Sequence, residues 1–572
     1  MLWARHYRKE LLPGDVGAGV IVALMLIPQG MAYALVAGLP PVTGLYASLL
    51  PAVAYAIFGS SMVQSVGPMA ITSLMVGTAV GALAPAGSVL YGQLAQQLAL
   101  VVGLVLFLCG VFRLGFLSSF FSRPVMSGFT TGAAVLIALE QLRPLLGLSH
   151  HWAFSTLHLP SAGVGLAALS LLVLARYGLP ALLKPLGGWM ADMLPKLVPI
   201  FVIVGATVAV AVLGLEGNGV KTVGAIPSGL PPLGLTLSHE HWRSLLLPSL
   251  VIGFMAFLAG QSAAQALAQK RNERINTNRE LLGLGAANLA SAVSGGFAVT
   301  GSISRSAVNY AAGANTPLAS LISAGLIAIA LCVPNAWLSL IPLPAMAATI
   351  VVAVVGMMDL STLVESWRHD RSDAATLVAT TAGVLLVGVE QGVLMGVVLS
   401  FASLIWRSSR PHIAIVGRLP GSEHFRNQER YTVETLPHML MLRIDSDLIF
   451  NNMDGVIERI EHELLVRPDV CDVVLVLSAV NMVDTTALLA LNELNKHMGE
   501  QQRRLHLCEV KGPVMDRLKL SKLLGNDLTG QVFLSAAQAY QHLADMAPTL
   551  VAARTALPPE GAVVALGRPG GD

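Results

Sequence analysis

Long apolar stretches dominate residues 16–406 and predict that the chain crosses a membrane many times. A helix needs about 20 mostly apolar residues to span a bilayer. Several stretches come close to that length, whereas others are shorter or are interrupted by glycine and proline. The expected spanning segments, about fourteen in number, are 16–37, 41–58, 67–82, 93–112, 125–142, 161–176, 197–215, 245–266, 281–294, 302–312, 318–333, 343–358, 374–388 and 391–406.

Two of these segments begin in an unusual way. "SVGPMAITSLMVG" (65–77) places a Gly-Pro pair before an apolar run that is too short to cross a bilayer, and "GGFAVTGSISRSAVNYAAG" (295–313) repeats the pattern and adds an arginine. They are the third and tenth segments, so they occupy matching places in two halves of seven helices, the second half inverted. Broken helices at matching positions of inverted repeats are typical of the binding site of a secondary transporter.

The pattern changes after Trp406, where charged residues become frequent. Strands are predicted to begin at Met439 and to cover 471–479 and 503–510, and helices are predicted at 453–466, 484–500 and 513–525. Strands and helices that alternate in this way predict an α/β sheet domain. The expected parts of the chain are an N-terminal cytoplasmic segment 1–15, a transmembrane domain 16–407, a linker and start of the tail 408–436, an α/β domain 437–550 and a disordered tail 551–572.

Composition supports a membrane protein and excludes some functions. Charged residues make up 12% of the chain and the mean hydropathy is +0.68, whereas soluble domains contain about 25% charged residues. A formal net charge of +2 gives no reason to expect nucleic-acid binding. The four cysteines lie far apart without metal-ligand spacing, and no nucleophile–base set or phosphate-binding loop is present. We therefore expect no metal, no cofactor and no enzyme activity.

The distribution of basic residues predicts the orientation of the chain. Cytoplasmic loops carry an excess of lysine and arginine, and here the basic loops alternate along the sequence. With the N-terminus in the cytoplasm, all of them lie on that side, and so does the α/β domain. The residues are Arg5, Arg8, Lys9, Arg113, Arg123, Arg176, Lys184, Lys270, Arg271, Arg274, Arg279, Arg368, Arg371, Arg407 and Arg410. The expected location is therefore the cytoplasmic (inner) membrane.

The two unusual helix starts have the chemistry of an anion site. A helix that begins inside a membrane leaves its first N–H groups without partners and carries about half a positive charge. Gly67 and Pro68 precede one start and Gly301 precedes the other. Ser302 and Ser304 supply hydroxyl groups there, and Arg305 adds a full positive charge. Donors and positive charge with no carboxylate nearby favour an anion; the alternative is that glycine and proline only kink two packed helices.

Several longer motifs resemble the SulP anion permeases. They are "IPQGMAYALVAGLPPVTGLYASLLP" (27–51), "SVGPMA" (65–70), "SRPVMSGFTTGAA" (122–134) and "NRELLGLGAANLASAVSGGFAVTGSISRSAVNYAAGANT" (278–316). The resemblance extends over nearly the whole chain. It implies a fourteen-helix fold of core and gate domains, an elevator-like movement of the core, and a homodimer.

The resemblance also implies which residues contact the anion. The matching positions are Gln29 and Tyr33 in the first helix, Met69 at the third, and Ser304 and Arg305 at the tenth. Ordinary core packing is the alternative for Tyr33 and Met69.

In one respect the chain departs from many bacterial members of this family, which carry an acidic residue in the eighth helix that has been linked to proton or sodium coupling. Ala259 stands at that position here, and the nearest polar groups are Gln261, Ser262 and Gln265. We therefore expect no proton or sodium coupling through this position, and anion exchange or uniport instead.

The tail resembles a STAS domain. In "VNMVDTTALLAL" (480–491) Thr486 takes the place of a phosphorylatable serine of anti-sigma-factor antagonists, and a phosphate at a helix N-terminus is electrostatically favoured. In transporters the tail more often serves dimerisation and folding, and it offers a surface for a cytosolic partner.

The leading hypothesis is a secondary transporter for a small inorganic anion, with sulfate first. Bicarbonate, chloride or a dicarboxylate are alternatives that would use the same broken helices. A nucleobase carrier of the same fold is disfavoured by Ala259 and Arg305, because such carriers use carboxylates in the eighth and tenth helices. A membrane-anchored regulatory protein, whose tail binds a partner, is the alternative from another class.

Overall fold

The computed structural model describes residues 3, 7–116, 122–148, 157–178, 188–224, 227–236, 241–333, 336–358, 360–521 and 523–554. Contacts divide the chain into two compact units, Met1–Phe401 and Ala402–Asp572. The expected disordered tail lies outside the described residues from 555 onward, and so do residues 1, 2 and 4–6 of the N-terminal segment.

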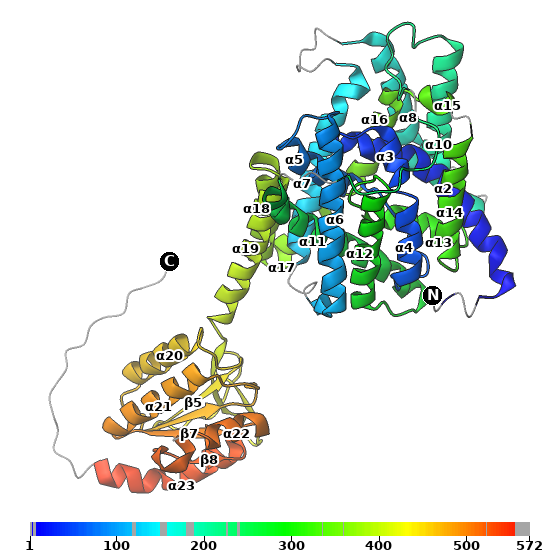
Figure 1. The fold of residues 1–572 in the computed structure, drawn as a ribbon. Helices are drawn as coiled ribbons and strands as arrows, with labels where there is room; N and C mark the ends of the chain where they lie inside the picture. The colour runs from blue at the N-terminus through cyan, green and yellow to red at the C-terminus, as the bar shows by residue number, and fades with distance from the viewer. Residues whose placement is uncertain are drawn as a thin grey trace. The chain divides into compact units, whose positions relative to one another are not determined.

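The first unit is built almost entirely of helices (Figure 1). Each of the predicted spanning segments contains a described helix, and among the described residues seven helical stretches, one of them Pro41–Phe58, are long and apolar enough to cross a membrane. The main helices are α2 (Leu12–Val36), α3 (Pro41–Tyr46), α4 (Leu50–Phe58), α5 (Ala70–Gly81), α6 (Val89–Val111), α7 (Arg123–Leu146), α8 (Leu159–Tyr177), α10 (Gly188–Val212), α11 (Trp242–Arg271), α12 (Thr277–Val293), α13 (Ile303–Ala311), α14 (Leu318–Cys332), α16 (Leu343–Val355), α18 (Arg371–Leu386) and α19 (Val389–Ser408).

Two details differ from the sequence-based expectation. The segment 41–58 is divided into α3 and α4, and each of these begins with a proline in its first turn. An additional helix, α17 (Leu360–His369), precedes α18. Its alternation of apolar with charged and polar residues made it too polar to count as a spanning segment.

Small residues let the helices of the first unit approach closely. A Cβ on Gly44 of α3 would lie 1.9 Å from the carbonyl oxygen of Gly30 in α2, and a Cβ on Gly285 of α12 would lie 2.4 Å from the Phe107 nitrogen of α6. Membrane helices rely on such close packing because lipid gives them little hydrophobic drive to associate. The glycines of this unit therefore fix which helices are neighbours.

The second unit contains a six-stranded sheet in the order β4-β3-β5-β6-β7-β8. Its strands are β3 (Ile413–Arg418), β4 (Phe425–Asn427), β5 (Met439–Ile444), β6 (Asp472–Val476), β7 (Arg504–Cys508) and β8 (Val532–Phe533). The neighbours from β5 to β8 are parallel, whereas β3 and β4 are antiparallel. Because β3 and β4 come from the 408–436 stretch, the sheet includes residues that were expected to form the linker and the start of the tail.

Both faces of this sheet are covered by helices. Leu440, Leu442 and Leu475 face a cluster with α20 (Met453–Val466), α21 (Thr485–Glu500) and α22 (Gly512–Lys519). Their neighbours Met441 and Val474 face the opposite cluster with α23 (Ala536–Arg554). Successive side chains of a strand point to opposite faces, so a strand covered on both sides is apolar throughout. This explains the continuous apolar run of β6.

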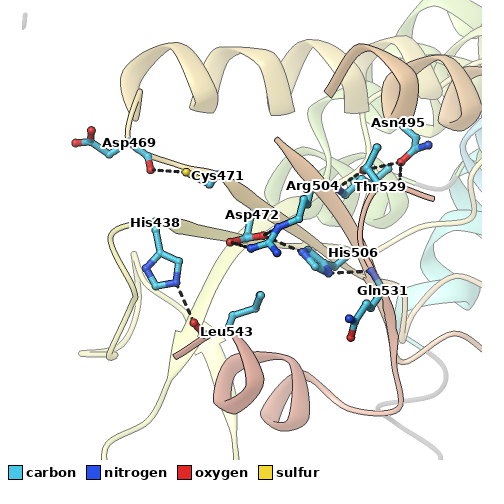
Figure 2. A network of polar contacts seen from close by, with 11 residues as sticks. His438, Asp469, Cys471, Asp472, Asn495, Arg504, His506, Thr529, Gln531 and Leu543 are labelled. Carbon is cyan, nitrogen blue, oxygen red and sulfur yellow. Dashed lines mark hydrogen bonds and ion pairs between the residues drawn. The ribbon is translucent and has the colours of Figure 1, made fainter. Parts of the chain in front are cut away.

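A buried polar network lies at the beginning of β6 and β7 (Figure 2). Asp472 is fully buried and accepts hydrogen bonds from Arg504 Nε (2.7 Å), Arg504 Nη2 (3.0 Å) and His506 Nε2 (2.9 Å). The other ring nitrogen of His506, Nδ1, accepts from the Gln531 N–H at 3.0 Å. Nε2 therefore carries the ring hydrogen, and both nitrogens of the neutral ring have partners.

Burial alone would raise the pKa of the Asp472 carboxyl, but hydrogen bonds from His506 and Arg504 lower it below its ordinary value. A lowered pKa in the folded state contributes stability above the unfolded-state value of about 3.9. This stabilisation is lost as the pH falls from the unfolded-state pKa through the lower folded-state pKa of Asp472.

We predict that Asp472→Asn destabilises the sheet by about 1.5–3 kcal/mol, because Arg504 and His506 lose a charged acceptor. Hydrogen–deuterium exchange of the full chain should show faster exchange in β6 and β7, and the wild-type protein should lose protection there as the pH falls below about 3.9. Asp516→Asn, at an exposed position of α22, is the control. Equal protection in the two variants would contradict the prediction.

Candidate functional site

The two unusual helix starts lie side by side. β1 (Val66–Gly67) pairs antiparallel with β2 (Thr300–Gly301), with Val66 opposite Gly301 and Gly67 opposite Thr300. Helix α5 begins three residues after β1, and α13 begins two residues after β2. The pairing therefore brings together the amino ends of two short helices that are more than 200 residues apart in the sequence, as predicted from their matching places in the two halves.

Local sequence explains why the chain is extended up to each helix start. Pro68 has no N–H to leave unpaired, and Met69 has extended backbone angles (φ −140°, ψ 145°) and provides no side-chain cap for α5. Gly301 has no room for a side chain, because a Cβ would lie 1.6 Å from Gln64 Nε2. Ser302 caps α13, since its hydroxyl accepts from the Arg305 N–H at 3.5 Å and contacts the Ser304 hydroxyl at 3.2 Å.

Arg305 links the two helix starts. It lies in the first turn of α13 and is 1% exposed, and its Nη1 donates to the carbonyl oxygen of Pro68 at 2.7 Å. Its Nε and Nη2 are buried and have no hydrogen-bond partner among the described residues. A buried guanidinium with free donors is costly. It therefore favours an anionic partner at this position.

Of the remaining expected residues, Gly67 and Tyr33 are the ones whose position beside this arginine the structure shows. A Cβ on Gly67 would lie 3.4 Å from Arg305 Nη2, so the backbone passes directly beside the guanidinium. Tyr33 of α2 is buried and lies near Arg305. Gln29 lies one turn earlier on α2 and is half-buried, and Met69 is buried. Ser304 is exposed, whereas Ser302 is buried.

Within the described part of the chain, the secondary candidates for anion binding on α11 have hydrogen-bond partners away from the two helix starts, or none. Ala259 is half-buried and packs against the same apolar cluster that contains Tyr33 and Met69. Gln261 Nε2 donates to the Thr277 hydroxyl at the start of α12 at 3.1 Å, and Ser262 is exposed. Among the described residues no hydrogen bond joins these three residues to Arg305 or to the two helix starts.

Sequence reasoning missed a set of buried polar residues behind the helix starts. Gln64 precedes β1 and donates to the Gly260 carbonyl of α11 at 2.9 Å. Tyr55 Oη lies 2.6 Å from Gln64 Oε1 and 2.8 Å from Glu280 Oε2 of α12. Glu280 could have been found from its chemistry, because an ionisable residue near an expected membrane segment is a functional candidate by default.

In the tail, Thr486 is the second residue of α21 and is exposed. The cap of that helix is Asp484, whose carboxylate accepts from the Ala487 N–H at 2.8 Å and the Phe450 N–H at 2.7 Å. The helix predicted at 484–500 is therefore present and is capped by its first predicted residue. Thr486 is accessible, but a phosphate there would adjoin this carboxylate.

The fold and the paired helix starts define a class of protein. A helical membrane unit in which two broken helices meet at their amino ends is typical of a multi-pass secondary transporter, and here an α/β domain follows it. The chain belongs to the sulfate permease family, whose model matches residues 12–380, and residues 430–539 match the STAS domain. The family resemblance and the fold class predicted from the sequence are thereby confirmed.

The chain aligns over most of its length with named relatives. It is 36% identical over 542 residues to the probable sulfate transporter Rv1739c of Mycobacterium tuberculosis, which covers 94% of this chain and 96% of the relative. It is 35% identical to the chloroplastic sulfate transporter 4.1 of Arabidopsis thaliana. The aligned part covers 86% of this chain and 74% of that relative. The fold matches that of the murine Slc26a9 anion transporter with a TM-score of 0.84 at 20% identity, covering 94% and 93% of the two chains.

We predict that Gly301→Ala displaces the Gln64 amide from Gly260 and Tyr55, because a Cβ would overlap that amide. Such overpacking costs about 1–3 kcal/mol, so the thermal unfolding midpoint in detergent should fall and anion binding should weaken. Gly17→Ala is the matched control, since nothing lies within 4 Å of its Cβ position in α2. A midpoint in Gly301→Ala as high as in this control would show that the close contact is unimportant.

Proposed function

We propose that this transporter carries sulfate across the cytoplasmic membrane and binds it between the starts of α5 and α13. The observation that carries the proposal is Arg305, a buried guanidinium with two nitrogen donors unpaired among the described residues, directly beside two helix amino ends. Gln29, Tyr33, Met69 and Ser304 complete the proposed site.

Charge favours a dianion over a monoanion. Each helix start contributes about half a positive charge, so the two starts and the guanidinium together provide about +2. Sulfate matches this value, whereas bicarbonate and chloride would leave about one positive charge uncompensated. The names of the relatives in Mycobacterium tuberculosis and Arabidopsis thaliana support the same choice.

Orientation and assembly follow from the distribution of charge and from the family. The N-terminus and the STAS domain lie in the cytoplasm in this proposal, because the basic loops alternate along the sequence. The protein functions as a homodimer that the STAS domain steadies, and that domain offers a surface to a cytosolic partner. Transport proceeds without enzymatic chemistry in this chain.

A competition assay tests the substrate. Purified protein in proteoliposomes takes up labelled sulfate, and unlabelled bicarbonate, chloride, succinate and fumarate compete with it. Sulfate should compete most strongly. Stronger competition by another anion would identify that anion as the substrate, and the absence of any flux would favour the membrane-anchored regulatory protein.

We predict that Arg305→Ala raises the Kd for sulfate about 10- to 100-fold, because hydrogen bonds to charged groups contribute about 1.5–3 kcal/mol and 1.4 kcal/mol is tenfold. Arg305→Lys should recover part of the affinity, since charge is kept while the fork of donors is lost. Equilibrium binding of labelled sulfate to the purified protein measures both. Arg274→Ala, at an exposed loop position, is the control; the same affinity in Arg305→Ala and in this control would refute the electrostatic role.

We also predict that truncation after Arg410 leaves sulfate affinity within about twofold of the full chain, a difference of less than 0.5 kcal/mol. The proposed site lies wholly in the first unit, Met1–Phe401. Turnover or expression should fall if the tail steadies the dimer. Loss of equilibrium binding in a folded truncated protein would place part of the site in the tail.

A further inference from the structure

A carboxyl group lies fully buried behind the proposed anion site. Glu280 of α12 is 0% exposed. Its Oε1 accepts from the Ser60 N–H (2.9 Å), the Ser60 hydroxyl (2.6 Å) and the Ser61 N–H (3.2 Å). Tyr55 Oη lies 2.8 Å from Oε2 and 2.9 Å from Oε1, and no other polar contact of Oε2 occurs among the described residues. The serine donors thus all bond to Oε1, whereas the tyrosine hydroxyl lies beside both oxygens.

Three oxygens follow one another at hydrogen-bond distance. Glu280 Oε2 is 2.8 Å from Tyr55 Oη, and Tyr55 Oη is 2.6 Å from Gln64 Oε1. Each contact needs one hydrogen between its two oxygens, and the tyrosine hydroxyl supplies only one. Since the carbonyl oxygen of Gln64 carries none, the second hydrogen must lie on the carboxyl group.

The orientation of the Gln64 amide is fixed independently. Its Nε2 donates to the backbone carbonyl oxygen of Gly260 at 2.9 Å, and a carbonyl oxygen can only accept. Rotating the amide by half a turn would place two acceptors against each other at that contact. Oε1 therefore faces Tyr55, and Gln64 can supply no hydrogen to the contact with the tyrosine hydroxyl.

From this geometry we infer that Glu280 is a proton-binding site coupled to the anion site, so that one proton accompanies the anion. The inference rests on the proposed function. Gln64 connects the two sites: its amide nitrogen fills the space beside Gly301, and Ser65, the next residue, bonds to α13 through Ser302 and Ser306. Arg305 lies between those two serines in the sequence, so a displaced Gln64 moves the turn that holds the guanidinium.

Loss of the proton disturbs this arrangement in a defined way. The Tyr55 hydroxyl then donates to the charged carboxylate, and the contact between Tyr55 Oη and Gln64 Oε1 becomes one between two acceptors. Gln64 must move away from Tyr55, towards the helix starts. The new negative charge also lowers the positive potential that favours the anion. Both effects weaken anion binding, so proton and anion favour each other's binding.

Few titratable groups lie near Glu280. Those on its own helix and on the elements packed against it are Tyr55, Tyr91, Cys109, Arg243, Lys270, Arg271 and Arg279. Arg279 donates to the Gly59 carbonyl oxygen at 3.3 Å, and Arg271 pairs with the Glu273 carboxylate at 2.9 Å. Tyr91 donates to Ala37. Of these groups only Tyr55 contacts the carboxyl directly among the described residues. The absence of coupling at Ala259 stays a prediction, whereas a proton bound at Glu280 replaces the exchange or uniport that was expected from Ala259.

Infrared difference spectra of the full chain in detergent test the bound proton. The wild-type spectrum should contain the carbonyl band of a protonated carboxylic acid that is missing in Glu280→Gln and present in Glu273→Gln, the matched control. Glutamine suits position 280, since its amide can donate to Tyr55 and accept from Ser60. A wild-type spectrum without this band overturns the inference, whichever anion is transported.

Binding and flux test the coupling. The wild-type Kd for sulfate, or for the anion that the competition panel selects, should rise by up to about tenfold per pH unit as the carboxyl loses its proton, the limit for one linked proton. Anion uptake into proteoliposomes at clamped membrane potential should acidify the lumen. In Glu280→Gln the Kd should not depend on pH and acidification should stop. Retained pH dependence in this variant would overturn the coupling, whereas failure of sulfate alone would overturn only the substrate assignment.

Discussion

Inside a membrane every backbone N–H group without a partner costs several kcal/mol, and a helix that begins there leaves its first N–H groups free. The pairing of β1 with β2 is how this chain tolerates two such starts. It provides backbone partners for Val66, Gly67, Thr300 and Gly301 just before the helices and sets the two amino ends against each other. The positive ends of two helix dipoles and the Arg305 guanidinium then meet in one place. Everything proposed for the anion depends on this pairing.

The pairing in turn depends on a residue that contacts no anion. Gln64 fills the space that a side chain at Gly301 would occupy, and it bonds to the backbone of α11 at Gly260. Thr300 also donates from β2 to α11, at the Ala256 carbonyl oxygen. Three segments from distant parts of the chain are thus held together by one amide, one hydroxyl and the absence of a side chain at position 301. A small shift of Gln64 is therefore transmitted directly to the start of α13.

Sequence alone predicted the parts of this structure that have a local signature. Apolar length located the helices, and a Gly-Pro pair and a nearby arginine marked the two broken starts. β1 and β2 were not predicted, because strands of two residues have no periodicity to detect. β3 and β4 were not predicted as strands either, since the pattern of the stretch 408–436 gave no clear element. The contact of Tyr55 with Glu280 joins residues 225 positions apart, and only the folded chain shows it.

The protonation of Glu280 determines whether the positive charge of the site suits a dianion or a monoanion. An ionised carboxylate behind the helix starts would cancel about half of the +2 that the dipoles and Arg305 provide, and the site would then suit a monoanion. The hydrogen count along Glu280, Tyr55 and Gln64 makes the carboxyl neutral in this conformation. The full charge is therefore available to a dianion while the proton is bound. The hydrogen on Glu280, which allows Tyr55 to donate to Gln64, thus also preserves the preference of the site for a dianion over a monoanion.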